Sequence, residues 1–109
     1  MATPVDYGTF TITATAAKLF TFADAGHPST MPTGGDSFMG KLETAPVRVR
    51  YDGAAPTASE GELIDIGDVL ILSANMINNC DVRCTGSTSA KLKGHFYRDN
   101  AEALVGGPR

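Results

Sequence analysis

Two cysteines and two histidines are among the side chains of this chain that could bind a metal or attack a substrate. Cys80 and Cys84 are four residues apart, which in an extended strand is about 13 Å and exceeds the roughly 7 Å limit for a disulfide. A bridge would therefore need a turn between them. His27 and His95 stand apart, so no spacing matches a structural zinc site. We expect two reduced, partly buried thiols that act as small apolar residues.

The carboxylates, serines and glycines form no motif typical of catalysis. Asp65 and Asp68 flank Gly67, which indicates a tight turn, because a calcium loop of the EF-hand type needs oxygen ligands at several fixed offsets. No Gly-x-Ser-x-Gly sequence occurs, and Gly34-Gly35 and Gly106-Gly107 lack the lysine and helix of a phosphate-binding loop. A metalloenzyme of the cupin type would need His-x-His, which is absent. We therefore expect no enzymatic activity, no metal and no cofactor.

Length and composition indicate one small globular domain, with 109 residues, 42% of them hydrophobic and 19% charged. The net charge of −3 opposes binding to a phosphate backbone, so we expect no nucleic-acid partner. The longest apolar runs are far shorter than the roughly 20 residues that span a bilayer, so we expect no membrane segment. The first residues do not resemble a secretory signal, and we expect synthesis in a cytoplasm.

The elements that would position these side chains are predicted from the alternation of apolar and polar residues along the chain. Period-two alternation predicts strands over residues 8–15, 38–42, 47–51 and 90–97, with a shorter candidate at 18–22. The continuous apolar run 69–72 predicts a strand buried on both faces and the strongest core element. Two brief strands are expected at residues 62–64 and 82–84, separated from each other by that run and by a corner or single helical turn at 75–79.

Seven or eight short strands between Gly, Pro, Asn and Asp turns predict an all-β fold. Its expected form is an antiparallel β-sandwich or barrel, jelly-roll-like, with extended termini. We expect an N-terminal arm at 1–7, a single β-sandwich domain at 8–98 and a C-terminal tail at 99–109 that could form one weak helical turn. Residues 24–36 are rich in turn formers, and this long loop is either a contact surface or a flexible connection.

Arg48 and Arg50 share one face of their predicted strand. They could engage carboxylates across an interface. They could instead lie on a solvated edge that discourages pairing between sheets, and this second interpretation is slightly favoured.

The central and C-terminal residues resemble a pattern of small virion proteins of tailed bacteriophages. The resemblance covers residues 47–97 and does not extend to 1–46. It is carried by Val47-Arg48-Val49-Arg50-Tyr51-Asp52-Gly53, Ala55-Pro56-Thr57, Glu60-Gly61-Glu62-Leu63, Gly67-Asp68-Val69-Leu70, Asn78, Arg83, Thr85-Gly86-Ser87-Thr88-Ser89-Ala90 and Leu92. It implies a head decoration or cement protein, which binds the outside of an assembled capsid and bridges subunits of the major capsid protein.

This resemblance implies two kinds of partner, the major capsid protein and sister copies in a homodimer or homotrimer, on the outer capsid surface of the virion. The arm, the 24–36 loop and the tail are the expected contact segments. The candidate contact residues are Pro4, Tyr7, His27, Met31, Arg48, Arg50, Arg98 and Arg109. Two alternatives stay open. One is a tail, fibre or head–tail joining component with the same fold, and the other is a small sugar-binding β domain, which the lack of tryptophan makes less favourable.

Overall fold

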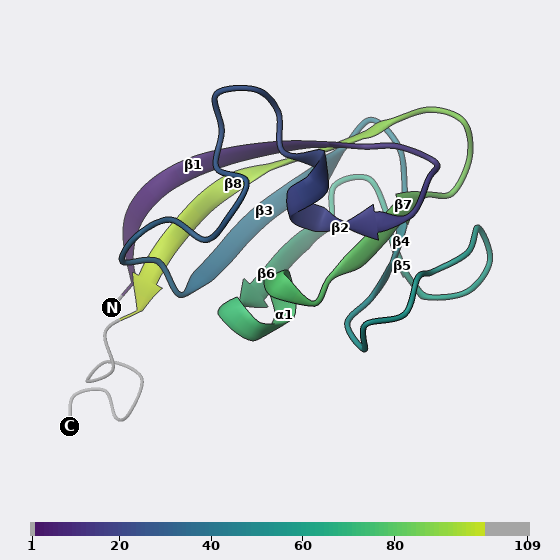
Figure 1. The fold of residues 1–109 in the computed structure, drawn as a ribbon. Helices are drawn as coiled ribbons and strands as arrows, with labels where there is room; N and C mark the ends of the chain where they lie inside the picture. The colour runs from purple at the N-terminus through teal and green to yellow at the C-terminus, as the bar shows by residue number, and fades with distance from the viewer. Residues whose placement is uncertain (1, 100–109) are drawn as a thin grey trace.

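Residues 2–99 are described by the computed structural model, in which eight strands form two four-stranded antiparallel sheets (Figure 1). The long-stranded sheet has the order β1-β8-β3-β6, and the short-stranded sheet has the order β2-β7-β4-β5. The elements in chain order are β1 (Ala2–Ile12), β2 (Ala17–Lys18), the 3-10 helix η1 (Leu19–Phe22), β3 (Ser37–Glu43), β4 (Val47–Arg50), β5 (Glu62–Ile64), β6 (Val69–Ser73), α1 (Ala74–Asn78), β7 (Asp81–Cys84) and β8 (Ala90–Asp99).

The strands pair as a set of nested hairpins. Strand β1 pairs with β8, β2 with β7, β3 with β6 and β4 with β5, all antiparallel. Consecutive strands β1 to β4 alternate between the two sheets, as do β5 to β8. This order is that of an eight-stranded jelly roll, and it confirms the predicted all-β sandwich. Because Ala2 pairs with Asp99, both ends of the described chain lie at one end of the molecule (Figure 1).

The core lies between the two sheets and follows from the period-two patterns of the strands. Three phenylalanines from the long-stranded sheet, Phe10, Phe38 and Phe96, are fully buried, and the Phe38 and Phe96 ring centroids lie 4.9 Å apart. Three β-branched side chains of the short-stranded sheet face them: Val47, Val49 and Val82. The helices close the ends of this core with the buried side chains Leu19 of η1 and Ile77 of α1.

Three glycines form a row across the inner face of the long-stranded sheet. Gly8 is paired with Gly94, and Gly94 is paired with Gly40. A Cβ atom at Gly8 would lie 2.7 Å from the Phe96 ring, and one at Gly40 would lie 2.6 Å from the Phe38 ring. The glycines therefore leave the space into which the phenylalanine rings pack, and β8 approaches β3 more closely there than a side chain would allow.

The first strand begins earlier than predicted. Residues 2–7, which we expected to form an arm, belong to β1 and pair with β8, whereas Ala14, expected inside, is exposed in the turn after Ile12. The period-two pattern is hidden in these residues because the register shifts between Pro4 and Asp6, where a bulge inserts an extra residue. Strand β8 ends at Asp99, and the rest of the predicted tail lies outside the described residues.

The prediction of a strand at residues 18–22 is wrong except for Lys18. Only Ala17 and Lys18 form β2, and Leu19 to Phe22 form η1. Helical spacing lets three apolar side chains of this segment turn toward the core, with Leu19 buried and Phe20 and Phe22 packed against it. Residues 24–36 form a loop, as predicted, and the strands expected near 38–42, 47–51, 62–64, 82–84 and 90–97 are present.

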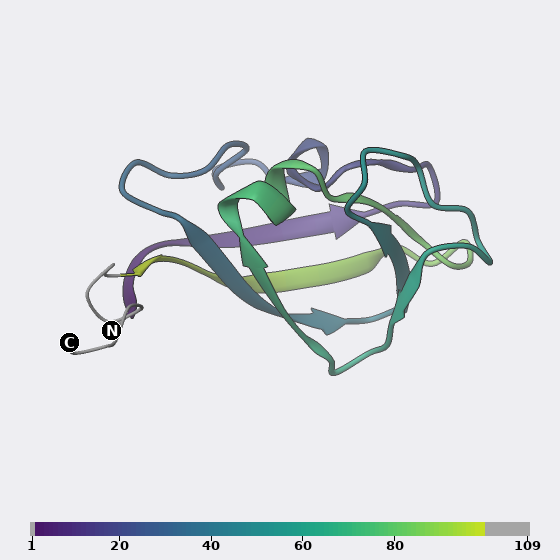
Figure 2. The same ribbon diagram turned by 90° about the horizontal axis from the view of Figure 1, so that it is seen from below.

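Strand β6 is not buried on both faces, which corrects the prediction for residues 69–72. Leu70 and Leu72 are buried, but Val69 is 56% exposed and Ile71 is 70% exposed. The reason is that the long-stranded sheet has the core on one face only, as the same alternation in its interior strand β3 shows; β6 is the border strand beside β3 (Figure 2). A sheet that has the core on one face only leaves alternate side chains of its strands in solvent.

Candidate functional site

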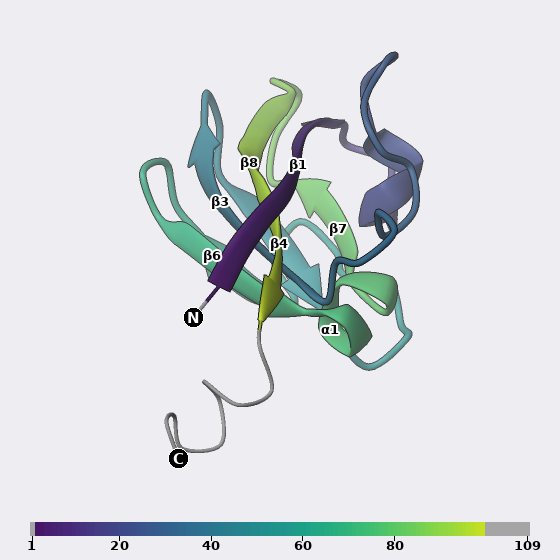
Figure 3. The same ribbon diagram turned by 90° about the vertical axis from the view of Figure 1, so that its left-hand side faces the viewer.

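The outer face of the long-stranded sheet carries a row of four side chains, one from each strand. Tyr7 is paired with His95, His95 with Met39 and Met39 with Ile71. We call these four residues the outer row. Tyr7, Met39 and Ile71 are 40%, 42% and 70% exposed, and no other helix or strand of residues 2–99 lies over this face (Figure 3).

Aromatic rings gather at the β1 end of the outer row. The ring of Tyr7 lies 5.1 Å from that of His95 and 5.8 Å from that of His27, both in edge-to-face arrangements. His95 in turn lies 6.2 Å from the ring of Tyr97. We call Tyr7, His27, His95 and Tyr97 the aromatic patch. Edge-to-face packing holds the rings in place before any partner binds, which reduces the entropy lost on association.

Two lysines of β8, Lys91 and Lys93, lie beside the outer row, and both have polar partners. Lys93 lies 3.5 Å from Glu43, and Lys91 donates a hydrogen bond of 2.7 Å to the hydroxyl of Thr11. Thr11 donates in turn to Asp24 at 2.6 Å. Their charges are therefore balanced locally, and the outer row itself contributes mainly apolar and aromatic surface.

A shallow hollow lies in the same face, between β6 and β8. Its lining combines apolar, basic and aromatic side chains with one glycine: Met39, Gly40, Lys41, Val69, Lys93, His95 and Tyr97. It is open to solvent and is not a deep cavity. Such a surface fits a protein side chain from a partner better than an enclosed small molecule, because small-molecule sites bury most of the ligand.

The fold brings together three of the predicted contact residues. Tyr7 and His27, 20 positions apart, meet because the loop after η1 folds back along β1, where His27 Nδ1 lies 3.4 Å from the Tyr7 carbonyl oxygen. Pro4 lies on the same strand, paired with Tyr97 of the aromatic patch. Met31 is partly buried and packs against the core.

Arg98 is exposed near the end of β8, in register with Thr3. Arg109 lies outside the described residues.

The arginine pair of β4 lies on the other sheet and does not join this site. Arg50 makes two hydrogen bonds to Asp52, at 3.1 and 2.5 Å, and Arg48 donates to the Gly61 carbonyl oxygen at 3.1 Å. The favoured interpretation of a solvated edge is wrong, because β4 lies between β7 and β5. The hydrogen bonds from Arg50 lower the pKa of Asp52, and the same pairing raises the pKa of Arg50.

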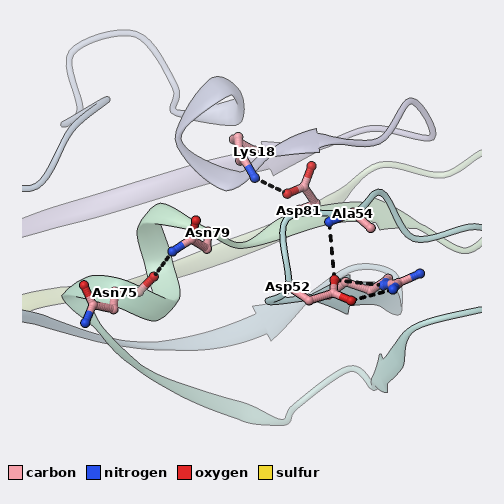
Figure 4. A network of polar contacts seen from close by, with 7 residues as sticks. Lys18, Asp52, Ala54, Asn75, Asn79 and Asp81 are labelled. Atoms are coloured by element: carbon pink, nitrogen blue, oxygen red, sulfur yellow. Dashed lines mark hydrogen bonds and ion pairs between the residues drawn. The ribbon is translucent and has the colours of Figure 1, made fainter.

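Polar contacts link residues of the short-stranded sheet, of the segment after β4 and of α1 (Figure 4). Lys18 of β2 bonds Asp81 of β7, and the Asp52 carboxylate accepts a bond of 3.3 Å from the Ala54 amide. Asn79 donates to the Asn75 carbonyl oxygen at 3.0 Å. These polar groups satisfy one another, whereas the Nε atom of Arg48 on the same sheet is buried and has no hydrogen-bond partner among the described residues.

Both cysteines are free and buried, as predicted. Burial, followed by the neighbouring Asp81 carboxylate, raises the pKa of Cys80 to about 12. The thiol is therefore protonated near neutral pH and is a poor nucleophile. Burial likewise raises the pKa of Tyr51 to about 12, so its hydroxyl stays protonated as well.

Within residues 2–99, no three His, Cys, Asp or Glu side chains are grouped closely enough to hold a metal ion. No helix in that part of the chain has the length and apolar character needed to cross a membrane. Comparison with protein-family models, with curated proteins and with solved structures found no match to this chain.

Sequence reasoning missed four residues of this surface: His95, Tyr97, Met39 and Ile71. The alternation in 90–97 had placed His95 and Tyr97 on the polar face of their strand, which is correct. What the pattern lacked was the order of the strands. Only the neighbours of β8 and β6 reveal that these side chains form one continuous surface with Tyr7.

Proposed function

We propose that this chain is a non-enzymatic structural protein of a tailed-bacteriophage virion. In this proposal it binds the outside of the capsid and stabilises it by bridging subunits of the major capsid protein. The observation that supports the proposal most is the exposed outer row with the adjoining aromatic patch. Exposed apolar surface of this kind is typical of protein–protein interaction sites, where tyrosine and methionine are enriched and charged residues are depleted in the centre.

The exposed apolar side chains of the outer row favour docking through the long-stranded sheet. Both sheets carry ion pairs, such as Lys18 with Asp81 on one and Lys93 with Glu43 on the other, so the cost of removing ion pairs from water does not distinguish them. Burying Tyr7, Met39 and Ile71 would contribute about 25 cal/mol for each Å² of apolar surface removed from water. We therefore assign the outer row to the capsid and the short-stranded sheet to solvent.

Size and charge are compatible with this role. A protein added to an assembled shell must stay soluble until it binds, and a net charge of −3 contributes to that while disfavouring attachment to DNA. Many copies on one lattice give avidity, so a modest affinity at each site is sufficient when a copy contacts two subunits.

Co-sedimentation with capsids tests the proposal. Undecorated, fully expanded capsids would be assembled from the major capsid protein of the phage that encodes this chain and mixed with the purified chain. We expect saturable binding at lattice positions and a capsid that withstands higher temperature. Binding to a single ring of sites would favour a head–tail joining component, and no binding at all would contradict the proposal.

Point variants separate the two faces in the same assay. Tyr7→Ala removes the tyrosine of the outer row, and loss of about 2 kcal/mol at such a position weakens binding roughly 30-fold. The matched control is Leu63→Ala, because Leu63 is 50% exposed on the other sheet. Deleting residues 1–7 is a poorer test, since these residues pair with β8 and their loss would damage the sheet.

A further inference from the structure

The four sheet edges of this sandwich differ in how well they are protected against pairing with another strand. The edge of β1 has Pro4, a bulge after it, and a backbone contact in which the Asp24 amide donates to the Thr9 carbonyl oxygen at 2.9 Å. Strands β2 and β5, at the edges of the other sheet, are only two and three residues long. Short strands, prolines and bulges are the usual means by which proteins block an edge.

The edge of β6 has none of these features. Its five residues, Val69 to Ser73, include no charge, no proline and no bulge, and they pair with β3 in unbroken register. Among residues 2–99, no strand pairs with its other side. A regular, uncharged edge strand with apolar side chains is a template for another strand.

The hydrogen bonds at the two ends of β6 show which backbone groups point outward. The Asp68 carbonyl oxygen accepts from the Leu42 amide, and the Ala74 amide donates to the Asp36 carbonyl oxygen, at 3.0 and 2.9 Å. Because partners alternate along an antiparallel ladder, the backbone groups of Leu70 and Leu72 face β3. Those of the other three residues, Val69, Ile71 and Ser73, face the open edge.

We propose that a second copy of this chain pairs with β6 along this edge, antiparallel and with a two-fold axis at Ile71. Ile71 then lies opposite Ile71 of the second copy, and Val69 lies opposite Ser73. These residues have their backbone groups turned outward, so each opposed pair exchanges two backbone hydrogen bonds. The two outer rows meet end to end, Ile71 against Ile71, and form one continuous row across both copies.

Charge within the paired strands does not oppose this occupant or this orientation. The paired strands are uncharged, and the nearest acidic residues, Asp65 and Asp68, precede β6. In the antiparallel pair the two Asp68 residues lie six positions apart along the strands, about 20 Å. That separation exceeds the Debye length of roughly 8 Å at physiological ionic strength, so the two copies do not repel each other there.

The size of the contact determines how strong the pairing is. A stable dimer buries roughly 1,200–2,000 Å² in total, and a five-residue strand is only about 17 Å long, so the edge alone supplies a fraction of that area. We therefore expect weak association in solution that becomes complete when neighbouring copies are concentrated on a lattice. Because the other edges are protected, pairing stops at two copies and does not continue into a fibre.

Cysteine cross-linking of the purified chain tests the proposed pairing. In the pair, the Cα atoms at position 71 of the two copies lie about 5.5 Å apart, which is within the range for a disulfide. Ile71→Cys is therefore expected to form a covalent dimer under mild oxidation at high protein concentration. The matched control is Met39→Cys, on the same face but one strand further in, where the two Cα atoms would be about 14 Å apart and no bridge forms.

Non-reducing electrophoresis and intact mass would measure the result, with the unsubstituted chain reporting on its own buried thiols. The pairing is supported if Ile71→Cys forms covalent dimer at least ten times faster than Met39→Cys. Equal rates for the two variants, or no dimer from either, overturn it. Both substitutions are at exposed positions, so the variants are expected to fold, and circular dichroism would verify this.

Ile71→Lys gives an independent measurement, because it places two like charges face to face. The concentration-dependent rise in average mass seen by sedimentation equilibrium for the unsubstituted chain is expected to disappear in this variant. No rise for either protein overturns the pairing. A rise that appears only after deletion of residues 100–109 assigns the edge to that segment of the same copy, and also overturns it.

This pairing deepens the proposed function by naming the surface between sister copies, but its test needs no capsid. A chain that dimerises through Ile71 and binds no capsid contradicts the proposed function alone. A chain that decorates capsids and shows no cross-link contradicts the pairing alone.

Discussion

Substituting Gly94 tests the close approach of β8 to β3, which sets the register of the outer row. A Cβ atom at this position would lie 2.1 Å from the Met39 carbonyl oxygen and 2.4 Å from the Gly40 Cα atom. Ordinary contacts of this kind are about 3.4 Å or longer. Gly94→Ala therefore forces the two strands apart by about an ångström, because both opposing atoms belong to the backbone.

The expected loss of stability is about 3 kcal/mol. Overpacking of this kind typically costs about 1–3 kcal/mol, and each weakened hydrogen bond between the strands adds about 0.5–1.5 kcal/mol. For a domain of this size the melting temperature would fall by roughly 10–20 °C. The matched control is Gly86→Ala, because a Cβ atom at Gly86 meets nothing within 4 Å.

Calorimetry or circular dichroism would measure both variants. Melting of Gly94→Ala within about 2 °C of the unsubstituted chain would refute the reasoning that a side chain has no space between the strands. A large loss in Gly86→Ala would show that the effect is a general cost of replacing glycine in this chain.

Three further predictions concern the core and the buried thiol. Phe96→Ala, which removes a ring packed against Phe10 and Phe38, is expected to lower the free energy of unfolding by about 3–5 kcal/mol in urea, while Tyr97→Ala on the outer face changes it far less. Cys80 has its pKa raised from 9.0 to about 12 in the folded chain, so stability is complete below pH 9 and declines as pH rises toward 12. When the pH rises from 8 to 10, the free energy of unfolding of Cys80→Ala is expected to fall by about 1 kcal/mol less than that of the unsubstituted chain, measured by urea midpoints. Equal losses would contradict the assignment of this pH dependence to Cys80. In native buffer at pH 8 the two thiols are expected to react with a colorimetric disulfide reagent only slowly, and rapidly after denaturation.

Local patterns in the sequence predict most of the strands because each residue of a half-buried strand has one of two environments. Strand β3 follows its period-two pattern directly. Phe38 and Leu42 are buried, whereas Lys41 and Glu43, on either side of Leu42, are exposed. The same holds for Leu92 and Phe96 in β8. Here the pattern along the chain is sufficient, and no knowledge of neighbouring strands is needed.

The errors occur where the environment depends on distant residues. Val69 and Ile71 read as core because they adjoin Leu70 and Leu72, and only the arrangement of the two sheets shows that one face of β6 lies in solvent. Leu19 was expected in a strand, but only its backbone amide continues the pairing of β2 with β7, by donating to the Cys80 carbonyl oxygen, and the chain then turns into η1 so that its side chain is buried. Such contacts are set by tertiary structure and leave no local pattern.

The candidate site shows the same division. Tyr7 and His27 were predicted individually, whereas their contact with His95 arises from the pairing of β1 with β8 and from the path of the loop after η1. The arginines of β4 were predicted beside a free edge, and the strand order instead gives β4 a neighbour on each side. Surfaces built from several strands are thus predicted only once the order of those strands is known.

The central claim is that this chain is a capsid decoration protein that docks through the outer row. The most direct measurement is an image reconstruction of particles purified from cells infected with the phage that encodes the chain, combined with the number of copies per particle. The account predicts copies at repeated lattice positions, with Tyr7 and Met39 against the shell and Leu63 in solvent. Particles that lack the chain, or copies that contact the shell through the short-stranded sheet, would contradict it.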